Sequence, residues 1–247
     1  MFRNFLFFFA ILLIGISCST GKESSSLVYT DYRIQKQGKT DSGLLKMLEP
    51  FSATLDASMN KVIGFSLINL NKKQPESGLG NFMADCIWLT AEKKFGRKVD
   101  AGFVNTGGIR SYIPKGNVTV GKIFELMPFD NLVVIQEVKG SVLLAFLNKT
   151  AADGGWPVSK SVTMGIKDKK AINIRIAGKP IDENGTYVIA NSDYVANGGD
   201  NCEMLKKIPF VNKGYLFRDA LIEFVTDLTL QGKALDYSIE NRVVHVN

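Results

Sequence analysis

The chain has 247 residues, of which 45% are apolar, and its 30 lysines and arginines outnumber its 24 aspartates and glutamates to give a net charge of +6. The apolar fraction excludes an intrinsically disordered protein, because it supplies enough hydrophobic surface to bury a core. The basic residues are scattered along the chain, which argues against a nucleic-acid binder. One histidine and three cysteines are too few for a zinc site built from His/Cys clusters.

Residues 1–17 are predicted to be a signal peptide. Arg3 gives a cationic start, and residues 5–16 form an apolar run of 12 residues, whereas a membrane span needs about 18 or more. Cys18 follows small residues and precedes a polar stretch, which is the pattern of a bacterial lipoprotein signal with Cys18 as the acylated N-terminus. An ordinary signal peptide with an incidental cysteine is the alternative. We therefore expect an exported, membrane-anchored lipoprotein, periplasmic or on the outer membrane, with residues 18–27 as a polar tether.

Residues 28–247 are predicted to form one domain of strands and helices, because no glycine-rich or proline-rich linker divides them. Helices are predicted where apolar residues recur every three or four positions, at residues 44–59 with a kink or break at Pro50, 79–95, 120–126, 141–150 and 215–230. Strands are predicted at the shorter apolar runs, at residues 28–35, 62–69, 100–104, 132–138, 161–166, 172–176, 186–190 and 242–246. The mixture of strands, helices and hairpins favours an α+β sandwich over a doubly wound parallel sheet.

Two loops that follow predicted buried strands carry groups suited to ligand binding. Residues 105–110 read Asn-Thr-Gly-Gly-Ile-Arg, where the paired glycines permit a tight turn and a close approach of backbone to a ligand. Asn105 and Arg110 can offer amide and guanidinium groups to the same point. Residues 194–200 place the ring of Tyr194 and the carboxylate of Asp200 around Asn-Gly-Gly, which suits a base together with sugar hydroxyls. Each loop taken alone is also consistent with a structural turn.

Taken together, the motifs resemble those of the 5′-nucleotidase C-terminal domain, in the 5′-nucleotidase / 2′,3′-cyclic phosphodiesterase type. Four segments follow one another in the order of that family, at residues 76–85, 105–110, 127–129 and 196–200. The resemblance covers roughly residues 28–247. It implies a layered α/β sandwich that binds nucleosides or nucleoside monophosphates.

The resemblance also implies a role for individual residues. Phe129 and Tyr194 would stack on the two faces of the base, and Tyr194 stands where the family usually has phenylalanine, so its hydroxyl is expected to play no part. Asn105 would face the base, and Arg110 the ribose and phosphate. Asp200 would accept hydrogen bonds from the ribose hydroxyls.

Other polar residues receive weaker or structural assignments. Lys73 stands near the place of a family arginine that helps to hold phosphate, and it keeps the charge without the two-pronged guanidinium. Asp85 is expected to be a structural carboxylate, and His245 an ordinary strand residue. Cys86 and Cys202 are expected to be two buried thiols, although a disulfide is possible in an exported protein.

Full-length members of the family carry a metallophosphoesterase domain whose two metal ions are held by Asp, His and Asn motifs, and no such motif is found in this sequence. The resemblance therefore implies no metal or other cofactor on this chain, two divalent metals on a partner chain, and no activity of this chain alone. We expect the specificity half of a split 5′-nucleotidase, acting in nucleotide dephosphorylation and catabolism with a separate metallophosphoesterase. The alternative is a free-standing nucleoside-binding surface lipoprotein for scavenging. A non-catalytic remnant is a third interpretation, and the retained site residues argue against it.

Overall fold

A computed structural model describes residues 41–246 of the chain, which divides into a unit of residues 1–47 and a unit of residues 48–247. The predicted signal peptide, Cys18 and the predicted strand at residues 28–35 lie outside the described residues. Helix α2 (Ser42–Met59) begins in the first unit and continues through Pro50 as one helix. None of the described helices has the length and the apolar character that crossing a bilayer requires.

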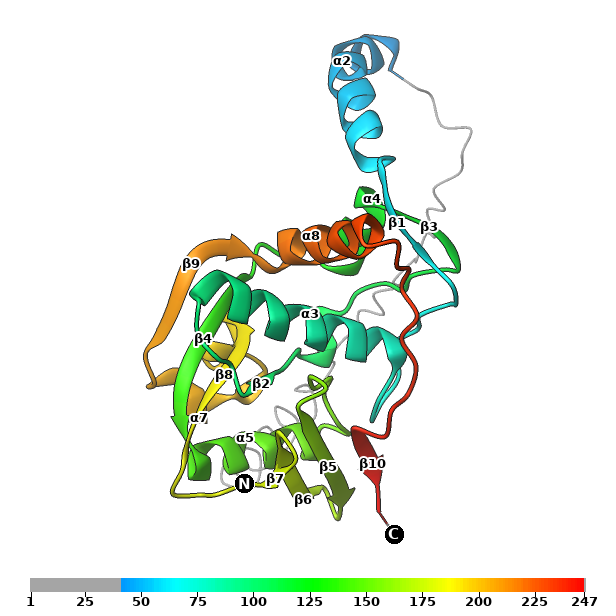
Figure 1. Ribbon diagram of the computed structural model, residues 1–247. Coiled ribbons are helices and arrows are strands. Elements are labelled where there is room, and N and C mark those ends of the chain that lie inside the picture. Colours follow the sequence, from blue (N-terminus) through cyan, green and yellow to red (C-terminus); the bar gives the residue numbers. More distant parts are fainter. Residues whose placement is uncertain (1–40, 247) are drawn as a thin grey trace, which may run out of the picture. The chain divides into compact units, whose positions relative to one another are not determined.

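The central sheet of the larger unit has the strand order β2-β8-β4-β9 (Figure 1). These strands are β2 (Ala101–Gly102), β8 (Thr186–Ser192), β4 (Leu132–Lys139) and β9 (Phe210–Leu216). β2 runs parallel to β8, whereas β4 is antiparallel to both β8 and β9. Successive residues of a strand point to opposite faces, and both faces are covered here: Val188 and Ala190 pack into one hydrophobic cluster, and Ile189 packs into another.

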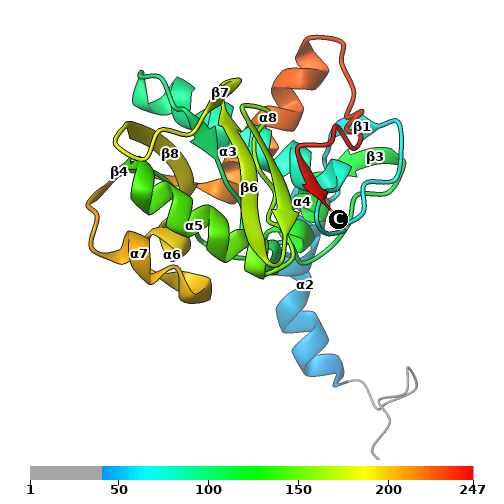
Figure 2. The same cartoon turned by 90° about the horizontal axis from the view of Figure 1, so that it is seen from below.

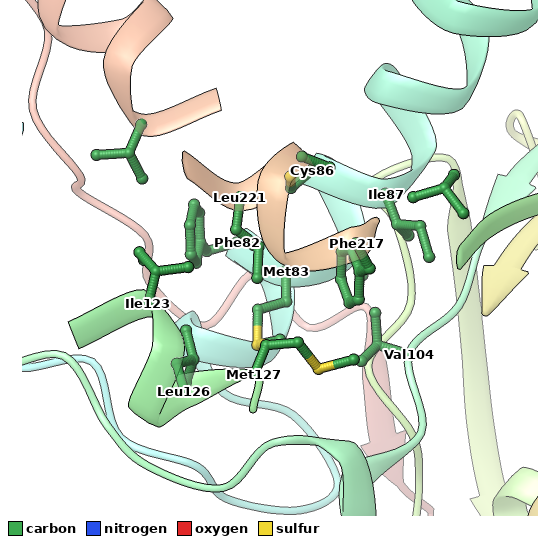
Figure 3. Close-up of a cluster of buried hydrophobic side chains, with 14 of the residues drawn as sticks. Phe82, Met83, Cys86, Ile87, Val104, Ile123, Leu126, Met127, Phe217 and Leu221 are labelled. Atoms are coloured by element: carbon green, nitrogen blue, oxygen red, sulfur yellow. The ribbon is translucent and has the colours of Figure 1, made fainter. Parts of the chain in front are cut away.

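Helices cover the first face of this sheet. α3 (Gly78–Phe95) and α8 (Phe217–Leu230) pack against the sheet, and α4 (Val120–Leu126) packs against α8. The side chains of Phe82, Met83, Met127 and Phe217 gather between them (Figure 3). The Ser77 hydroxyl caps α3 by accepting a hydrogen bond from the Gly80 amide at 3.1 Å. A two-stranded sheet of β1 (Val62–Ser66) and β3 (Gly116–Thr119) pairs in antiparallel fashion beside this layer.

Helix α5 (Gly140–Ala152) lies on the second face, and a second sheet packs against it (Figure 2). The second sheet has the order β10-β5-β6-β7. Its strands are β10 (Val243–His245), β5 (Val162–Lys167), β6 (Lys170–Ile176) and β7 (Lys179–Pro180). The rings of Phe103, Phe146 and Trp156 meet edge to face in this core, with centroids 5.1 and 5.8 Å apart. The layers alternate helix, sheet, helix and sheet, so the predicted α+β sandwich is confirmed.

A buried ion pair ties α3 to the C-terminal segment. Both oxygens of Asp85 accept hydrogen bonds from the Arg242 guanidinium, at 2.7 and 2.8 Å. The backbone amide of Lys160 also donates to Asp85, at 2.7 Å, and Arg242 donates to the carbonyl of Val158, at 3.0 Å. Asp85 therefore has the structural role that the sequence predicts.

The structure also corrects the sequence-based elements. Residues 215–216 end strand β9 instead of starting the helix, which begins at Phe217; the strand is mostly exposed and lacks the apolar alternation that identifies strands. Several elements were not predicted: β3, β7, β9, α6 (Asp193–Ala196) and α7 (Glu203–Lys206). The strand predicted at residues 100–104 is reduced to the two residues of β2. Cys86 and Cys202 are both buried and unpaired, and His245 ends strand β10.

Candidate functional site

A cavity of about 300 Å³ lies beyond the carboxyl ends of β2 and β8. It is lined by Asn105, Gly107, Gly108, Arg110, Phe129, Asn131, Tyr194 and Asp200. These residues come from three loops, which follow β2, α4 and β8. Because β2 and β8 are parallel neighbours, the loops that leave them emerge at the same edge of the sheet. The topology therefore brings together five of the six residues that the sequence assigned to ligand binding.

The loop after β2 is fixed by its glycines and by α4. A short 3₁₀ turn (Thr106–Gly108) closes when the Gly108 amide donates to the Asn105 carbonyl at 3.0 Å. A Cβ atom on Gly108 would come within 2.7 Å of the Asn105 side-chain oxygen, so a larger residue there would displace the Asn105 amide. The Arg110 amide donates to the carbonyl of Leu126, the last residue of α4, at 3.0 Å. This bond links the first loop to the second.

Phe129 presents its ring to the cavity, and its backbone carbonyl is hydrogen-bonded by Arg218. The residue is 39% exposed, and the Arg110 guanidinium lies 5.8 Å from the ring centroid. Arg218, which is buried on α8, donates to the Phe129 carbonyl at 3.3 Å and to the Asp130 carboxylate at 2.7 Å. The ring is therefore free to contact a ligand while its loop has a fixed position.

The third loop follows β8 and has an unusual backbone. The Ser192 hydroxyl accepts from the Val195 amide at 3.3 Å and starts the short helix α6, which carries Tyr194. Gly198 has a φ of +91°, and Asp200 has a φ of +51°, a left-handed conformation that is uncommon outside glycine. A Cβ atom on Gly199 would lie 2.5 Å from the Tyr194 ring, so this glycine lets the ring rest against the loop.

Asp200 joins the first and third loops through its carboxylate. Oδ2 accepts from the Asn105 amide Nδ2 at 2.7 Å, and Oδ1 accepts from the Tyr194 hydroxyl at 2.9 Å. The Asp200 backbone amide in turn donates to the Tyr194 hydroxyl oxygen at 3.2 Å. The hydrogen bond to Asp200 raises the pKa of Tyr194, so the phenol keeps the proton that it donates. The hydroxyl thus makes two hydrogen bonds to Asp200, which the sequence analysis did not foresee.

Lys73 is the one assigned residue that the structure does not bring to this cavity. It lines a separate cavity of about 230 Å³ near the start of α3, together with Glu76 and Tyr237. The preceding residue, Lys72, reaches the first loop instead, because its ammonium group donates to the carbonyl of Ile109 at 2.9 Å. Neither lysine is among the residues that line the cavity.

Asn131 is a cavity residue that the sequence analysis missed. The sequence could have identified it by its position, because it follows Phe129 by two residues in the same loop. The cavity thus offers two rings, two side-chain amides, a guanidinium and one carboxylate. Such a set can stack on a planar ring, accept hydrogen bonds from adjacent hydroxyls and attract an anionic group. Within residues 41–246, no group of three or more His, Cys, Asp or Glu side chains is placed to hold a metal ion.

The chain is similar in sequence to a 5′-nucleotidase family model and to curated bacterial proteins. A family model described as 5′-nucleotidase, C-terminal domain, matches residues 53–207. Protein UshA of Yersinia enterocolitica is 28% identical over 194 residues, which make up 75% of this chain and 34% of that protein. The 5′-nucleotidase of Vibrio cholerae is 26% identical over 197 residues, 76% of this chain and 34% of that protein.

Solved structures agree in fold. A 5′-nucleotidase precursor from Thermus thermophilus matches with a TM-score of 0.70 and 25% identity, over 82% of this chain and 43% of the other. The NAD nucleotidase of Haemophilus influenzae matches with a TM-score of 0.62 at 18% identity, over 84% of this chain and 42% of the other. This chain spans about a third of the length of the curated relatives that it matches.

Proposed function

This chain belongs to the 5′-nucleotidase C-terminal domain family, and from that premise we propose that it binds nucleosides or nucleoside monophosphates in the cavity beyond β2 and β8. One observation carries the proposal. Two exposed rings, a hydrogen-bonded carboxylate and a guanidinium, drawn from three separate loops, line a single cavity of about 300 Å³. That volume is at the lower end of small-molecule sites, which run from about 300 to 1,000 Å³.

Each group has a role in this proposal. Phe129 and Tyr194 offer aromatic faces on which a base can stack, and each is more than a third exposed. Asp200 offers carboxylate oxygens to the two hydroxyls of a ribose, and Asn105 holds that carboxylate in place. Arg110 lies beside the Phe129 ring, where its positive charge favours a phosphate on the ligand.

Binding is tested by calorimetric titration of the chain from Cys18 onward with adenosine and AMP. We expect saturable binding of both ligands, with AMP the tighter because of Arg110. Arg110→Gln should weaken AMP more than adenosine, because only AMP carries the phosphate. Absence of binding by the folded wild-type chain to adenosine, AMP and the other common nucleosides would contradict the proposal.

We also propose that hydrolysis takes place on a separate metallophosphoesterase chain. The sequence supports this with its single histidine. The purified chain should release no phosphate from AMP with or without manganese or zinc. A pull-down of the tagged full-length protein from native membranes should recover a metallophosphoesterase, and adding that protein should give a nucleotidase. Recovery of a nucleoside transporter in its place would favour the free-standing scavenging lipoprotein.

For location, we propose export and membrane anchoring through a lipid on Cys18. The support is the apolar run of residues 5–16, which ends in small residues and a cysteine. The wild-type protein should partition into the detergent phase and carry an acylated Cys18 by mass spectrometry. Cys18→Ala should lose the lipid, and unchanged detergent partitioning in this variant would contradict the anchor.

A further inference from the structure

We infer that the Tyr194 hydroxyl is a positioning group that sets the Asp200 carboxylate for a vicinal diol, separately from any stacking on the Tyr194 ring. The inference rests on the proposed function, because it concerns how the same cavity recognises a ribose. It assigns to one side chain two roles that can be measured independently.

The first observation is the backbone of the loop. Asp200 and Asn201 have φ values of +51° and +61°, in the left-handed region that is uncommon outside glycine and that aspartate and asparagine adopt more readily than other residues with a side chain. Such conformations persist only where the surroundings hold them. The Asp200 amide donates to the Tyr194 hydroxyl oxygen at 3.2 Å, so the hydroxyl is one of the groups that hold this backbone.

The second observation is the carboxylate. The Tyr194 hydroxyl donates to Oδ1 at 2.9 Å, and the Asn105 amide donates to Oδ2 at 2.7 Å. An ionised carboxylate has about four acceptor positions, so one donor on each oxygen leaves each oxygen able to accept one more. Two donors from different loops also prevent the group from rotating. A fixed carboxylate with one free position on each oxygen matches two adjacent hydroxyls.

The third observation separates the hydroxyl from the ring. The ring rests over Gly199, where an added Cβ atom would be 2.5 Å away, and this packing does not use the hydroxyl. Tyr194→Phe therefore keeps the aromatic face and its support while it removes both hydrogen bonds to Asp200. Stacking should survive this substitution, and diol recognition should weaken.

The experiment compares adenosine with 2′,3′-dideoxyadenosine by calorimetric titration. The proteins are the wild type, Tyr194→Phe, Asp200→Gly and the double variant, each as the chain from Cys18 onward. Glycine is chosen at residue 200 because it removes the carboxylate and tolerates the positive φ. Tyr112→Phe is the matched control, since Tyr112 is also half exposed and its hydroxyl makes no hydrogen bond to the residues that the structure describes.

We expect the wild type to prefer adenosine by about tenfold or more, as hydrogen bonds to a charged group would give. Tyr194→Phe should reduce that preference about threefold or more and change dideoxyadenosine affinity less than twofold, whereas Tyr112→Phe should change neither. In the Asp200→Gly background, Tyr194→Phe should cause no further loss, because the hydroxyl acts through the carboxylate.

Three results would overturn the inference while leaving the proposed function in place: an unchanged preference in Tyr194→Phe, an equal loss of both ligands, or a loss that persists in the Asp200→Gly background. The last result would mean that the hydroxyl contacts the sugar directly. Failure of the folded wild type to bind either ligand would overturn the proposed function, and this inference with it.

Discussion

Two aspartates in this domain each accept two side-chain hydrogen bonds, yet they have different roles. Asp85 lies in the interior and is bonded twice by Arg242, a neighbour of full positive charge that is itself buried. Asp200 lies at the surface of a cavity and is bonded by two neutral groups, from Asn105 and Tyr194. Asp85 has its charge cancelled within the protein, whereas Asp200 keeps its charge for whatever enters the cavity.

The difference lies in the partners more than in the number of bonds. A buried charge must be paired, because an uncompensated charge in the interior is costly. A carboxylate at the surface of a cavity can be fixed by amide and phenol groups without losing its attraction for hydroxyl donors. We therefore expect changes around Asp85 to affect stability alone and changes around Asp200 to affect ligand binding alone.

The largest expected effect comes from breaking the buried pair. Asp85→Ala removes the buried partner of Arg242, which keeps only the more exposed Glu240, 2.9 Å away, and should lower the free energy of unfolding by up to about 3–5 kcal/mol, as measured by urea denaturation. The double variant Asp85→Ala/Arg242→Met should recover part of this loss, because no unpaired charge remains. The comparison fails if the single variant is as stable as the wild type, or if the folded protein has lost nucleoside binding.

The next effect is the loss of a stacking ring. Phe129→Ala should weaken adenosine binding about tenfold or more, since a base stacked on an aromatic side chain contributes about 1–3 kcal/mol. Its melting temperature should stay close to that of the wild type, because the ring is 39% exposed and only its backbone is held by Arg218. A large fall in melting temperature without a selective loss of binding would show Phe129 to be a core residue.

A smaller effect should follow from adding one methyl group under the other ring. In Gly199→Ala the new Cβ atom lies 2.5 Å from the Tyr194 ring, so the ring must move. Adenosine affinity should fall severalfold, or by about 1 kcal/mol. The double variant Tyr194→Ala/Gly199→Ala should bind no more weakly than Tyr194→Ala alone, because the clash is gone. Additive losses would show that Gly199 acts independently of the ring.

The smallest effect concerns Glu223, a half-buried acidic residue that belongs neither to the buried ion pair nor to the cavity. Hydrogen bonds from Lys93, and then from Tyr215 and Lys94, lower the pKa of Glu223 from 4.5 to about 2. A lowered carboxyl pKa stabilises the folded state above the unfolded value near 4.5, and this contribution is lost as the pH falls toward 2. At neutral pH the free energy of unfolding of the wild type should be higher than that of Glu223→Gln by about 0.2–1 kcal/mol. Urea titrations at about pH 7, 5 and 3 should show the difference shrinking only below 4.5, and a constant difference would contradict this origin.

The sequence predicted the helices well where apolar spacing and caps agree. Helix α3 runs from Gly78 to Phe95, against a prediction of 79–95, because Ser77 caps it and Gly96 ends it in a left-handed conformation. Strand β9 could not be found in this way. Its residues are held by pairing with β4 and are mostly exposed, so no alternation marks them.

The sequence predicted most residues of the candidate site but not the hydrogen bonds between them. Loop motifs identified Asn105, Arg110, Phe129, Tyr194 and Asp200, and the parallel pairing of β2 with β8 brings their loops together. Motif spacing placed Lys73 at this site, whereas Lys73 lines another cavity, since side-chain direction in an irregular segment depends on tertiary contacts. It also could not show that the Tyr194 hydroxyl bonds Asp200, because that bond depends on the left-handed backbone at residue 200.

The pairing of β2 with β8 has a consequence for how the domain folds. Asn105 and Asp200, which meet in the cavity, are 95 residues apart in the chain, and contacts of such long range form slowly. A fragment that ends before residue 200 lacks the Asp200 carboxylate of the cavity. After dilution from denaturant, the return of ligand binding therefore reports the pairing of β2 with β8, whereas helical circular dichroism can recover earlier.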